Sequence, residues 1–120
     1  MATTKSYRDI TDRTSSYLAV LRRDIPETTK GFGALSMAVN KDGALDRKTK
    51  ELISLALSVA ARCDPCVGYH AEAAVKLGIT REQIEEMLGV CVYMGGGPAL
   101  MYAAEALAAF EEFSKPRQAV

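Results

Sequence analysis

The sequence has 120 residues, which is the length of one ordinary domain, and we expect a single domain over residues 1–120. Apolar residues make up 48% and charged residues 25%, as in a typical soluble globular protein. Fifteen basic residues balance fifteen acidic ones, so no net charge attracts nucleic acid or an anionic membrane surface over a long range.

The lack of a signal-peptide pattern and of a membrane-spanning run predicts a cytoplasmic protein. The first six residues lack the apolar stretch of a signal peptide, and the longest apolar runs are far shorter than the ~20 residues that span a bilayer. We therefore expect no membrane partner. In a reducing compartment, the three cysteines are expected to be catalytic, metal-binding or inert rather than a permanent disulfide framework.

The first half of the chain predicts three helices. The first covers Ser6–Asp24 and ends at Ile25, because a following proline disfavours helical backbone. Pro26 opens the second helix, and Asn40–Gly43 is a turn signal. The third helix covers Arg47–Ala61 and is apolar nearly all round after its first turn, which predicts a central helix, a subunit interface, or both.

Three more helices are predicted in the second half, about six in total. The fourth begins at Pro65 and continues to Leu77. The fifth begins after a Thr80 capping box and ends at a tight break at Gly95–Pro98, and the last covers Ala99–Phe113. No stretch alternates apolar and polar residues over strand length, so the sequence predicts a compact all-α fold.

A C-x-x-C-x-x-x-H cluster lies at the predicted start of the fourth helix. With Asp64 as the N-cap, Cys66 falls in the first turn, where free N–H groups and the helix dipole favour a thiolate. Cys63 lies just outside the helix, and this spacing lets the two sulfurs meet, so the pair can cycle between dithiol and disulfide. His70, the single histidine, follows four residues after Cys66 and can take and return the thiol proton.

Two other interpretations of this cluster are open. The cysteines can be buried, inert thiols, with His70 a hydrogen-bonded structural residue. Alternatively, Cys63, Cys66 and His70 are zinc ligands, with Cys91 or a carboxylate as the fourth. The apolar spacing around Cys91 otherwise predicts a small core residue.

Glu51 is a further candidate because it begins the apolar run of the third helix. A buried carboxylate needs a partner, and a proton relay with His70 would supply one. On the local pattern alone, a partly exposed charge in the first helical turn is the simpler interpretation.

These four residues together read E-x11-C-x2-C-x3-H, which resembles the signature of the alkylhydroperoxidase D-like proteins of the carboxymuconolactone decarboxylase superfamily. The resemblance covers about residues 32–110. It extends to the Leu45–Glu51 segment before the apolar helix and to Met94–Ala99 after the fifth helix. One departure is that Asp64–Pro65 stands where the best-known peroxidase of the family carries a second histidine.

The resemblance implies a helical homo-oligomer, trimeric or hexameric, with peroxidase or disulfide-reductase activity. Its catalytic residues would be Cys63, Cys66, His70 and Glu51, with no bound cofactor or metal. By analogy, Cys66 attacks a small hydroperoxide, Cys63 resolves the sulfenic acid, and a dithiol such as a protein-bound lipoyl group reduces the disulfide. The alternatives are a lactone decarboxylase and a non-enzymatic zinc-binding or redox-sensing module.

Overall fold

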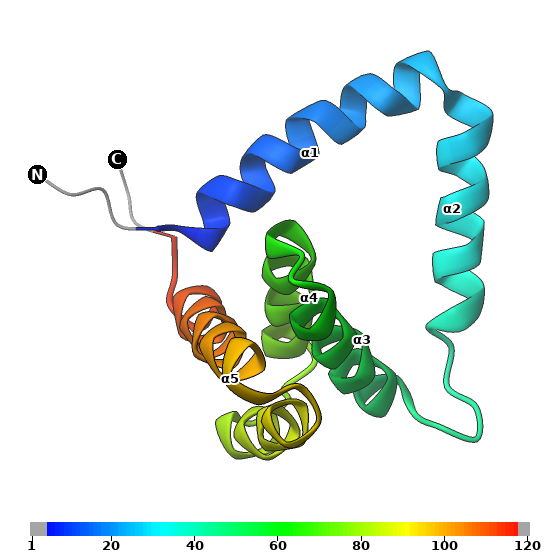
Figure 1. Cartoon of the computed structure of the whole chain (residues 1–120). Coiled ribbons are helices and arrows are strands. Elements are labelled where there is room, and N and C mark those ends of the chain that lie inside the picture. The colour runs from blue at the N-terminus through cyan, green and yellow to red at the C-terminus, as the bar shows by residue number, and fades with distance from the viewer. Residues whose placement is uncertain (1–4, 118–120) are drawn as a thin grey trace, which may run out of the picture.

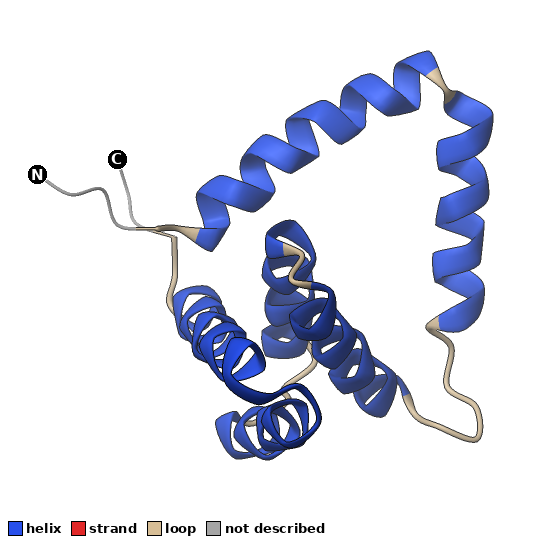
Figure 2. Cartoon of the chain, viewed as in Figure 1, coloured by secondary structure: helices blue, strands red, loops and turns tan. Residues whose placement is uncertain are grey.

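The computed structural model describes residues 5–117, which contain five α-helices and no β-strand (Figure 2). The helices are α1 (Tyr7–Asp24), α2 (Pro26–Val39), α3 (Arg47–Ala61), α4 (Asp64–Lys76) and α5 (Arg81–Ser114). The all-α prediction is therefore confirmed, and the predicted bounds of the first three helices hold to within one residue.

The predicted fifth and sixth helices are both present, and they follow each other across a kink within one element, α5, of 34 residues. The predicted break is present inside it as a kink. Gly96 has φ 70° and ψ −152°, a conformation that a glycine adopts without steric cost. Pro98 follows within the helix and lacks the N–H that would continue the regular hydrogen bonding.

Three of the helices begin at side-chain N-caps whose residue types can be recognised in the sequence. Ser6 and Asp46 accept hydrogen bonds from backbone N–H groups in the first turns of α1 and α3. Thr80 and Gln83 form a reciprocal capping box at the start of α5. Each cap satisfies N–H groups that have no partner within the helix.

Helices α3, α4 and α5 pack together into the body of the molecule, and the first half of α1 lies across α4 and α5 (Figure 1). Small residues allow the close approach. A Cβ atom added at Gly68 of α4 would lie 2.6 Å from the Thr11 Cγ2 atom of α1. The buried side chains of the core are Tyr7, Leu55, Val59, Val67, Ala71, Ala74, Ile79, Ile84, Leu88, Ala103, Ala106, Ala109, Phe110 and Phe113.

The second half of α1 and all of α2, residues 17–39, extend away from this body, and we call them the arm (Figure 1). Within the described chain, α2 contacts α1 and no other helix, and none of its residues is buried. The apolar side chains of α1 are therefore only partly covered: Tyr7 is buried, whereas Tyr17 and Leu21 are exposed. The arm also leaves Phe32 and Met37 exposed, at 71% and 74%.

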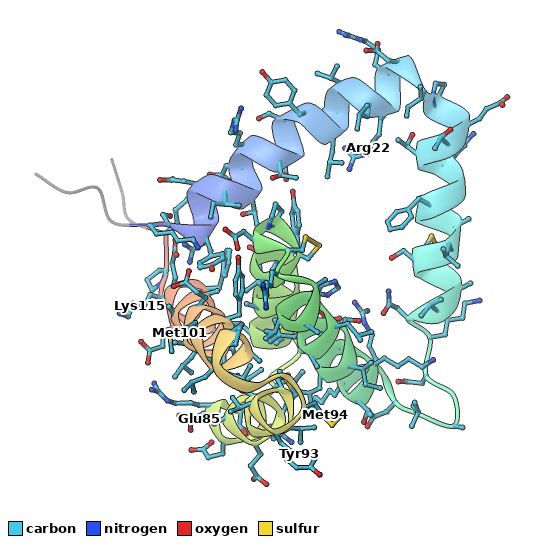
Figure 3. The ribbon with its side chains drawn as sticks, in the orientation of Figure 1. Arg22, Glu85, Tyr93, Met94, Met101 and Lys115 are labelled. Atoms are coloured by element: carbon cyan, nitrogen blue, oxygen red, sulfur yellow. A yellow bond between two sulfur atoms is a disulfide. The ribbon has the colours of Figure 1, made fainter. Side chains whose placement is uncertain are left out.

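Apolar side chains are also exposed on the body. Leu57 on α3 is 63% exposed, although Leu55 and Val59 on the same helix are buried. Tyr93, Met94 and Met101 project from α5 into solvent (Figure 3). By length and composition alone, α5 is the one helix of the described chain that could cross a membrane, a test that the core helix of a soluble protein also passes.

Candidate active site

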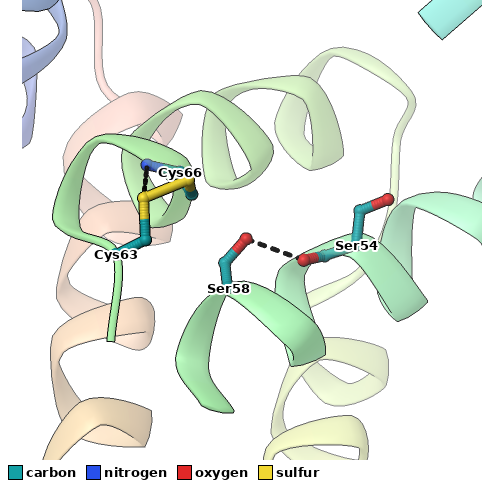
Figure 4. Close-up of a disulfide and its surroundings, with 4 residues drawn as sticks. All are labelled: Ser54, Ser58, Cys63 and Cys66. Carbon is teal, nitrogen blue, oxygen red and sulfur yellow. Dashed lines mark hydrogen bonds between the residues drawn. A yellow bond between two sulfur atoms is a disulfide. The ribbon is translucent and has the colours of Figure 1, made fainter. Parts of the chain in front are cut away.

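The cysteine pair lies at the junction of α3 and α4, where Cys63 and Cys66 are joined by a disulfide (Figure 4). Arg62 adopts a left-handed backbone conformation, with φ 55°, that ends α3. The Cys63 N–H then donates to the Ser58 carbonyl oxygen at 3.2 Å, which fixes the turn against the end of α3. Both cysteines are half-buried.

The predicted N-cap of the fourth helix is wrong by one residue. Cys63, rather than Asp64, is the cap, because its Sγ accepts a hydrogen bond from the Cys66 N–H at 3.3 Å (Figure 4). Asp64 is the first helical residue. Cys66 still lies in the first turn, among N–H groups that favour negative charge. After reduction of the disulfide, this position stabilises a thiolate on either sulfur.

Glu51 and His70 form a close pair across α3 and α4, with 2.6 Å between Glu51 Oε1 and His70 Nδ1. Glu51 is 3% exposed, so its interpretation as an exposed first-turn charge is wrong. The His70 side chain keeps 36% of its surface exposed. When Nδ1–H donates to the carboxylate, Nε2 is the ring nitrogen left for a substrate or a thiol.

The four predicted site residues thus fall into two contacting pairs on one side of α4. Cys63 is bonded to Cys66, and Glu51 contacts His70. His70 follows Cys66 by four residues on the same helix, which places both side chains on one helical face. Among residues 5–117, no group of three or more His, Cys, Asp or Glu side chains is arranged to hold a metal ion.

A second charged cluster, which the sequence did not reveal, adjoins the disulfide at Asp64. The Lys5 Nζ atom lies 3.2 Å from Asp64 Oδ2 and 2.5 Å from Glu105 Oε1. The Tyr7 hydroxyl donates to the same Glu105 oxygen at 2.8 Å. Lys5 is distant from Asp64 in the sequence and 100 residues from Glu105, so no local pattern could have predicted this cluster.

The electrostatics of the cluster follow from these contacts. The hydrogen bond to Glu105 raises the pKa of Lys5, and the same bond lowers the pKa of Glu105. The neighbouring Asp64 carboxylate raises the pKa of the Tyr102 phenol. Lys5 is therefore a cation and Glu105 an anion at neutral pH. The second Asp64 oxygen, Oδ1, is buried without a hydrogen-bond partner.

Cys91 lies apart from the disulfide, on α5. It packs against the core and is half-buried, so the prediction of a core residue holds only at the edge of the core. Burial raises the pKa of its thiol, which disfavours the reactive thiolate. Its side chain lines an apolar groove of about 320 Å³ between α3 and α5, together with Leu57, Val90 and Met94.

Similar proteins of known structure share this architecture. A carboxymuconolactone decarboxylase family protein from Legionella pneumophila is 57% identical, with a TM-score of 0.90 over 91% of this chain and 97% of that one. A family member from Thermotoga maritima, described as having a possible part in an antioxidative response, is 36% identical. Its TM-score is 0.65 over 78% of this chain and 86% of that one.

Sequence comparisons agree. An uncharacterised protein of Cupriavidus necator is 43% identical over 86 residues, which are 72% of this chain and 76% of that protein. An alkyl hydroperoxide reductase of Coxiella burnetii is 29% identical over 62 residues, which are 52% of this chain and 35% of that protein. The model of the carboxymuconolactone decarboxylase family matches residues 26–109. The chain therefore belongs to the carboxymuconolactone decarboxylase family, as an alkylhydroperoxidase D-like member.

Proposed function

We propose that the protein is a thiol-dependent peroxidase or disulfide oxidoreductase that works through Cys63 and Cys66. The observation that carries this proposal is the disulfide at the start of α4, one helical turn before His70, which pairs with the buried Glu51. The distant similarity to an alkyl hydroperoxide reductase supports the same class of reaction.

In the peroxidase reaction, the reduced enzyme meets a small hydroperoxide at Cys66. The thiolate sulfur attacks the terminal peroxide oxygen, so an S–O bond forms while the O–O bond breaks, and the alcohol leaves after taking up a proton. Cys66 becomes a sulfenic acid. The Cys63 thiolate then attacks the Cys66 sulfur, and the disulfide forms as water leaves.

An external dithiol, such as a protein-bound lipoyl group, completes the cycle. One of its thiolates attacks the Cys63–Cys66 disulfide, and its second thiol releases the reduced enzyme, while the donor becomes a disulfide. A substrate disulfide would take the place of the peroxide in the oxidoreductase version. This chemistry needs no bound cofactor and fits the reducing cytoplasm, where we place the protein.

His70 and Glu51 act as a proton relay in this proposal. His70 accepts the Cys66 thiol proton and returns a proton to the leaving alcohol. Glu51 keeps the ring oriented and stabilises the imidazolium that forms when the proton arrives, because the carboxylate lies 2.6 Å from Nδ1. The relay involves a single imidazole, because the chain has one histidine.

We further propose that the protein works as a homo-oligomer, either a trimer or a hexamer. The arm supports this assembly, because a 14-residue helix such as α2, with no buried residue, is marginal in water by itself. The exposed apolar side chains of α2, α3 and α5 are also typical of surfaces that a subunit interface covers.

Steady-state turnover of a hydroperoxide with a lipoyl-type dithiol tests this function. Cys63→Ser and Cys66→Ser should each abolish turnover, whereas Cys91→Ser should retain it, since Cys91 lies outside the cluster. Full activity in either Cys63→Ser or Cys66→Ser would refute the proposal. Decarboxylation of a carboxymuconolactone by the wild type would favour the lactone decarboxylase instead. Stoichiometric zinc in the purified protein would favour a zinc-binding module.

A further inference from the structure

Asp64 occupies an unusual position for an acidic residue in a redox-active motif. It directly follows Cys63 and precedes Cys66 by two residues, at the first position of α4. A carboxylate there interacts favourably with the helix dipole. The same negative charge opposes a thiolate on either neighbouring sulfur, because like charges in a partly desolvated site repel each other.

Lys5 is the cation that contacts this carboxylate. Its Nζ atom lies 3.2 Å from Asp64 Oδ2, and the Lys5 side chain is held in place by Glu105, at 2.5 Å. The Lys5 Nζ atom also lies 5.1 Å from the centre of the Tyr7 ring. The N-terminal segment, α4 and α5 therefore meet around the Lys5 ammonium group, next to the cysteine pair.

The Lys5–Asp64 contact affects the site electrostatics because Asp64 is partly buried. The Asp64 side chain is 33% exposed, and its Oδ1 atom is buried with no hydrogen-bond partner. One carboxylate oxygen thus meets neither a donor nor water, so its charge is less screened than that of a surface aspartate. Within residues 5–117, Lys5 is the ion-pair partner of this group.

We propose that Asp64 and Lys5 form a charge pair that sets the balance between the dithiol and disulfide states of Cys63 and Cys66. In this role both are positioning residues, since they act through the sulfurs and do not contact the substrate. The inference rests on the proposed dithiol–disulfide cycle and adds a control of its equilibrium.

The redox step is the exchange with an external dithiol. The S–S bond of the protein breaks as two electrons and two protons arrive from the donor, whose own sulfurs become bonded. Above the thiol pKa, one of the two protons is released and a thiolate remains. A cation near that thiolate favours the reduced protein, and an anion favours the disulfide.

The two members of the pair must therefore act with opposite sign. Loss of the Asp64 charge stabilises the thiolate and shifts the equilibrium toward the dithiol. Loss of the Lys5 charge leaves the carboxylate uncompensated and shifts the equilibrium toward the disulfide. A purely structural contact behaves differently, because removal of either partner weakens the same interaction and the two effects have the same sign.

Other titratable groups face this end of α4, and the variants keep them constant. Tyr102 and Glu105 approach from α5, and Tyr7 approaches from α1. Glu51 contacts His70 from α3, one turn along α4 from Cys66. Burial is the largest of the effects that raise the pKa of Tyr7, so this phenol stays neutral throughout the measurement.

The test uses the full chain carrying Cys91→Ser, so that Cys63 and Cys66 are its only cysteines. In this background, Asp64→Asn and Lys5→Gln are each compared with the unsubstituted pair. The readouts are the alkylation rate of the reduced pair against pH and the equilibrium with glutathione at about pH 9, above the pKa of a free thiol. Lys76→Gln is the matched control, because it removes a cation from the far end of α4, 4.0 Å from Glu72.

We expect Asp64→Asn to lower the thiol pKa and Lys5→Gln to raise it. Each should change the glutathione equilibrium about threefold in opposite directions, as suits a partly exposed pair. Lys5→Arg should restore wild-type behaviour, and the double variant should lie between the single ones. Thermal unfolding identifies variants that fail to fold. If Lys5→Gln fails to fold, the thiol pKa and glutathione equilibrium of Lys5→Arg, which keeps the charge, are compared with those of the wild type instead.

Shifts of the same sign in both variants, or shifts no larger than in Lys76→Gln, would overturn the charge-pair proposal while leaving the proposed function intact. A wild-type pair that exchanges with no dithiol at all would overturn both.

Discussion

The Glu51 carboxylate lies 2.6 Å from the His70 ring, although 19 residues and a helix junction separate the two in sequence. Glu51 is one of three buried polar or charged residues of the described chain, together with Thr11 and Ser58. A buried carboxylate is costly unless a donor satisfies it, and His70 is the donor in this site. The pair therefore fixes the orientation of α4 against α3 as well as that of the imidazole.

Substitution of Glu51 by glutamine should separate its electrostatic effect from its packing. Glu51→Gln keeps the size of the side chain but cannot stabilise an imidazolium, so we expect hydroperoxide turnover to fall by about 10²-fold. The free energy of unfolding in urea should change by only about 1 kcal/mol. Glu72→Gln, on α4 beside Lys76, is the control and should keep wild-type turnover. Unchanged turnover in Glu51→Gln would remove the residue from the relay.

Gly68 should be intolerant of any side chain. An added Cβ would lie 2.6 Å from Thr11 Cγ2, and Thr11 is buried with its hydroxyl bonded to the Tyr7 carbonyl. We expect Gly68→Ala to destabilise the protein by about 1–3 kcal/mol through overpacking of α1 on α4. Gly89, also helical, has nothing within 4 Å of such an atom. Gly89→Ala should therefore stabilise by about 0.5–1 kcal/mol, and urea unfolding of the two variants measures the contrast. Equal effects would contradict the close packing.

Substitutions in the arm should test whether it forms part of a subunit interface. Phe32 is 71% exposed in the single chain, and burial in an interface would make a charge there costly. We expect Phe32→Glu to convert the trimer or hexamer into smaller species, as measured by sedimentation velocity. Lys30→Glu changes the charge of the same helix by more, at an exposed polar position, and should leave the oligomer intact. A wild type that sediments as a monomer would refute the proposed assembly.

Acid should weaken the attachment of α1 through Glu112. Burial raises the pKa of this carboxyl, but hydrogen bonds from Ser6, Tyr7 N–H and Arg8 N–H outweigh it, so the folded-state pKa lies below the ordinary 4.5. The contribution to stability is therefore complete above the unfolded pKa and is lost as pH falls through the lower folded value.

Glu112→Gln should accordingly cost about 1 kcal/mol at neutral pH, and the cost should shrink as the pH falls below about 4. Urea unfolding at a series of pH values measures this. Glu86→Gln, an exposed carboxylate on the same helix, should show no such convergence. A Glu112→Gln penalty that stays constant with pH would contradict the assignment.

Local sequence signals predicted most of the helical bounds. Proline at position 26, the aspartate at 46 and the Thr80–Gln83 box each act within one helical turn, and the structure has helices that begin at these places. The kink at Gly96 and the helices on both sides of it were also predictable from the Gly95–Pro98 segment. The N-cap of α4 was misassigned because a cysteine sulfur accepts the hydrogen bond that Asp64 was expected to accept.

Contacts between distant segments could not be predicted in this way. Local pattern alone favoured an exposed Glu51, and its burial depends on how α3 meets α4. The Lys5–Asp64 contact depends on α1 lying across the start of α4, which no local pattern encodes. Exposure of the arm was likewise unpredictable, since an apolar helical face indicates burial without indicating which chain covers it.

The most direct test of the central claim is a single-turnover reaction of the fully reduced protein with a stoichiometric amount of hydroperoxide. Peptide mass spectrometry and thiol titration follow the fate of the three cysteines. We expect one peroxide to be consumed as the Cys63–Cys66 disulfide forms, Cys91 to stay reduced, and added dithiol to restore the starting state. Peroxide that remains unconsumed, with both thiols of the pair still free, would contradict it.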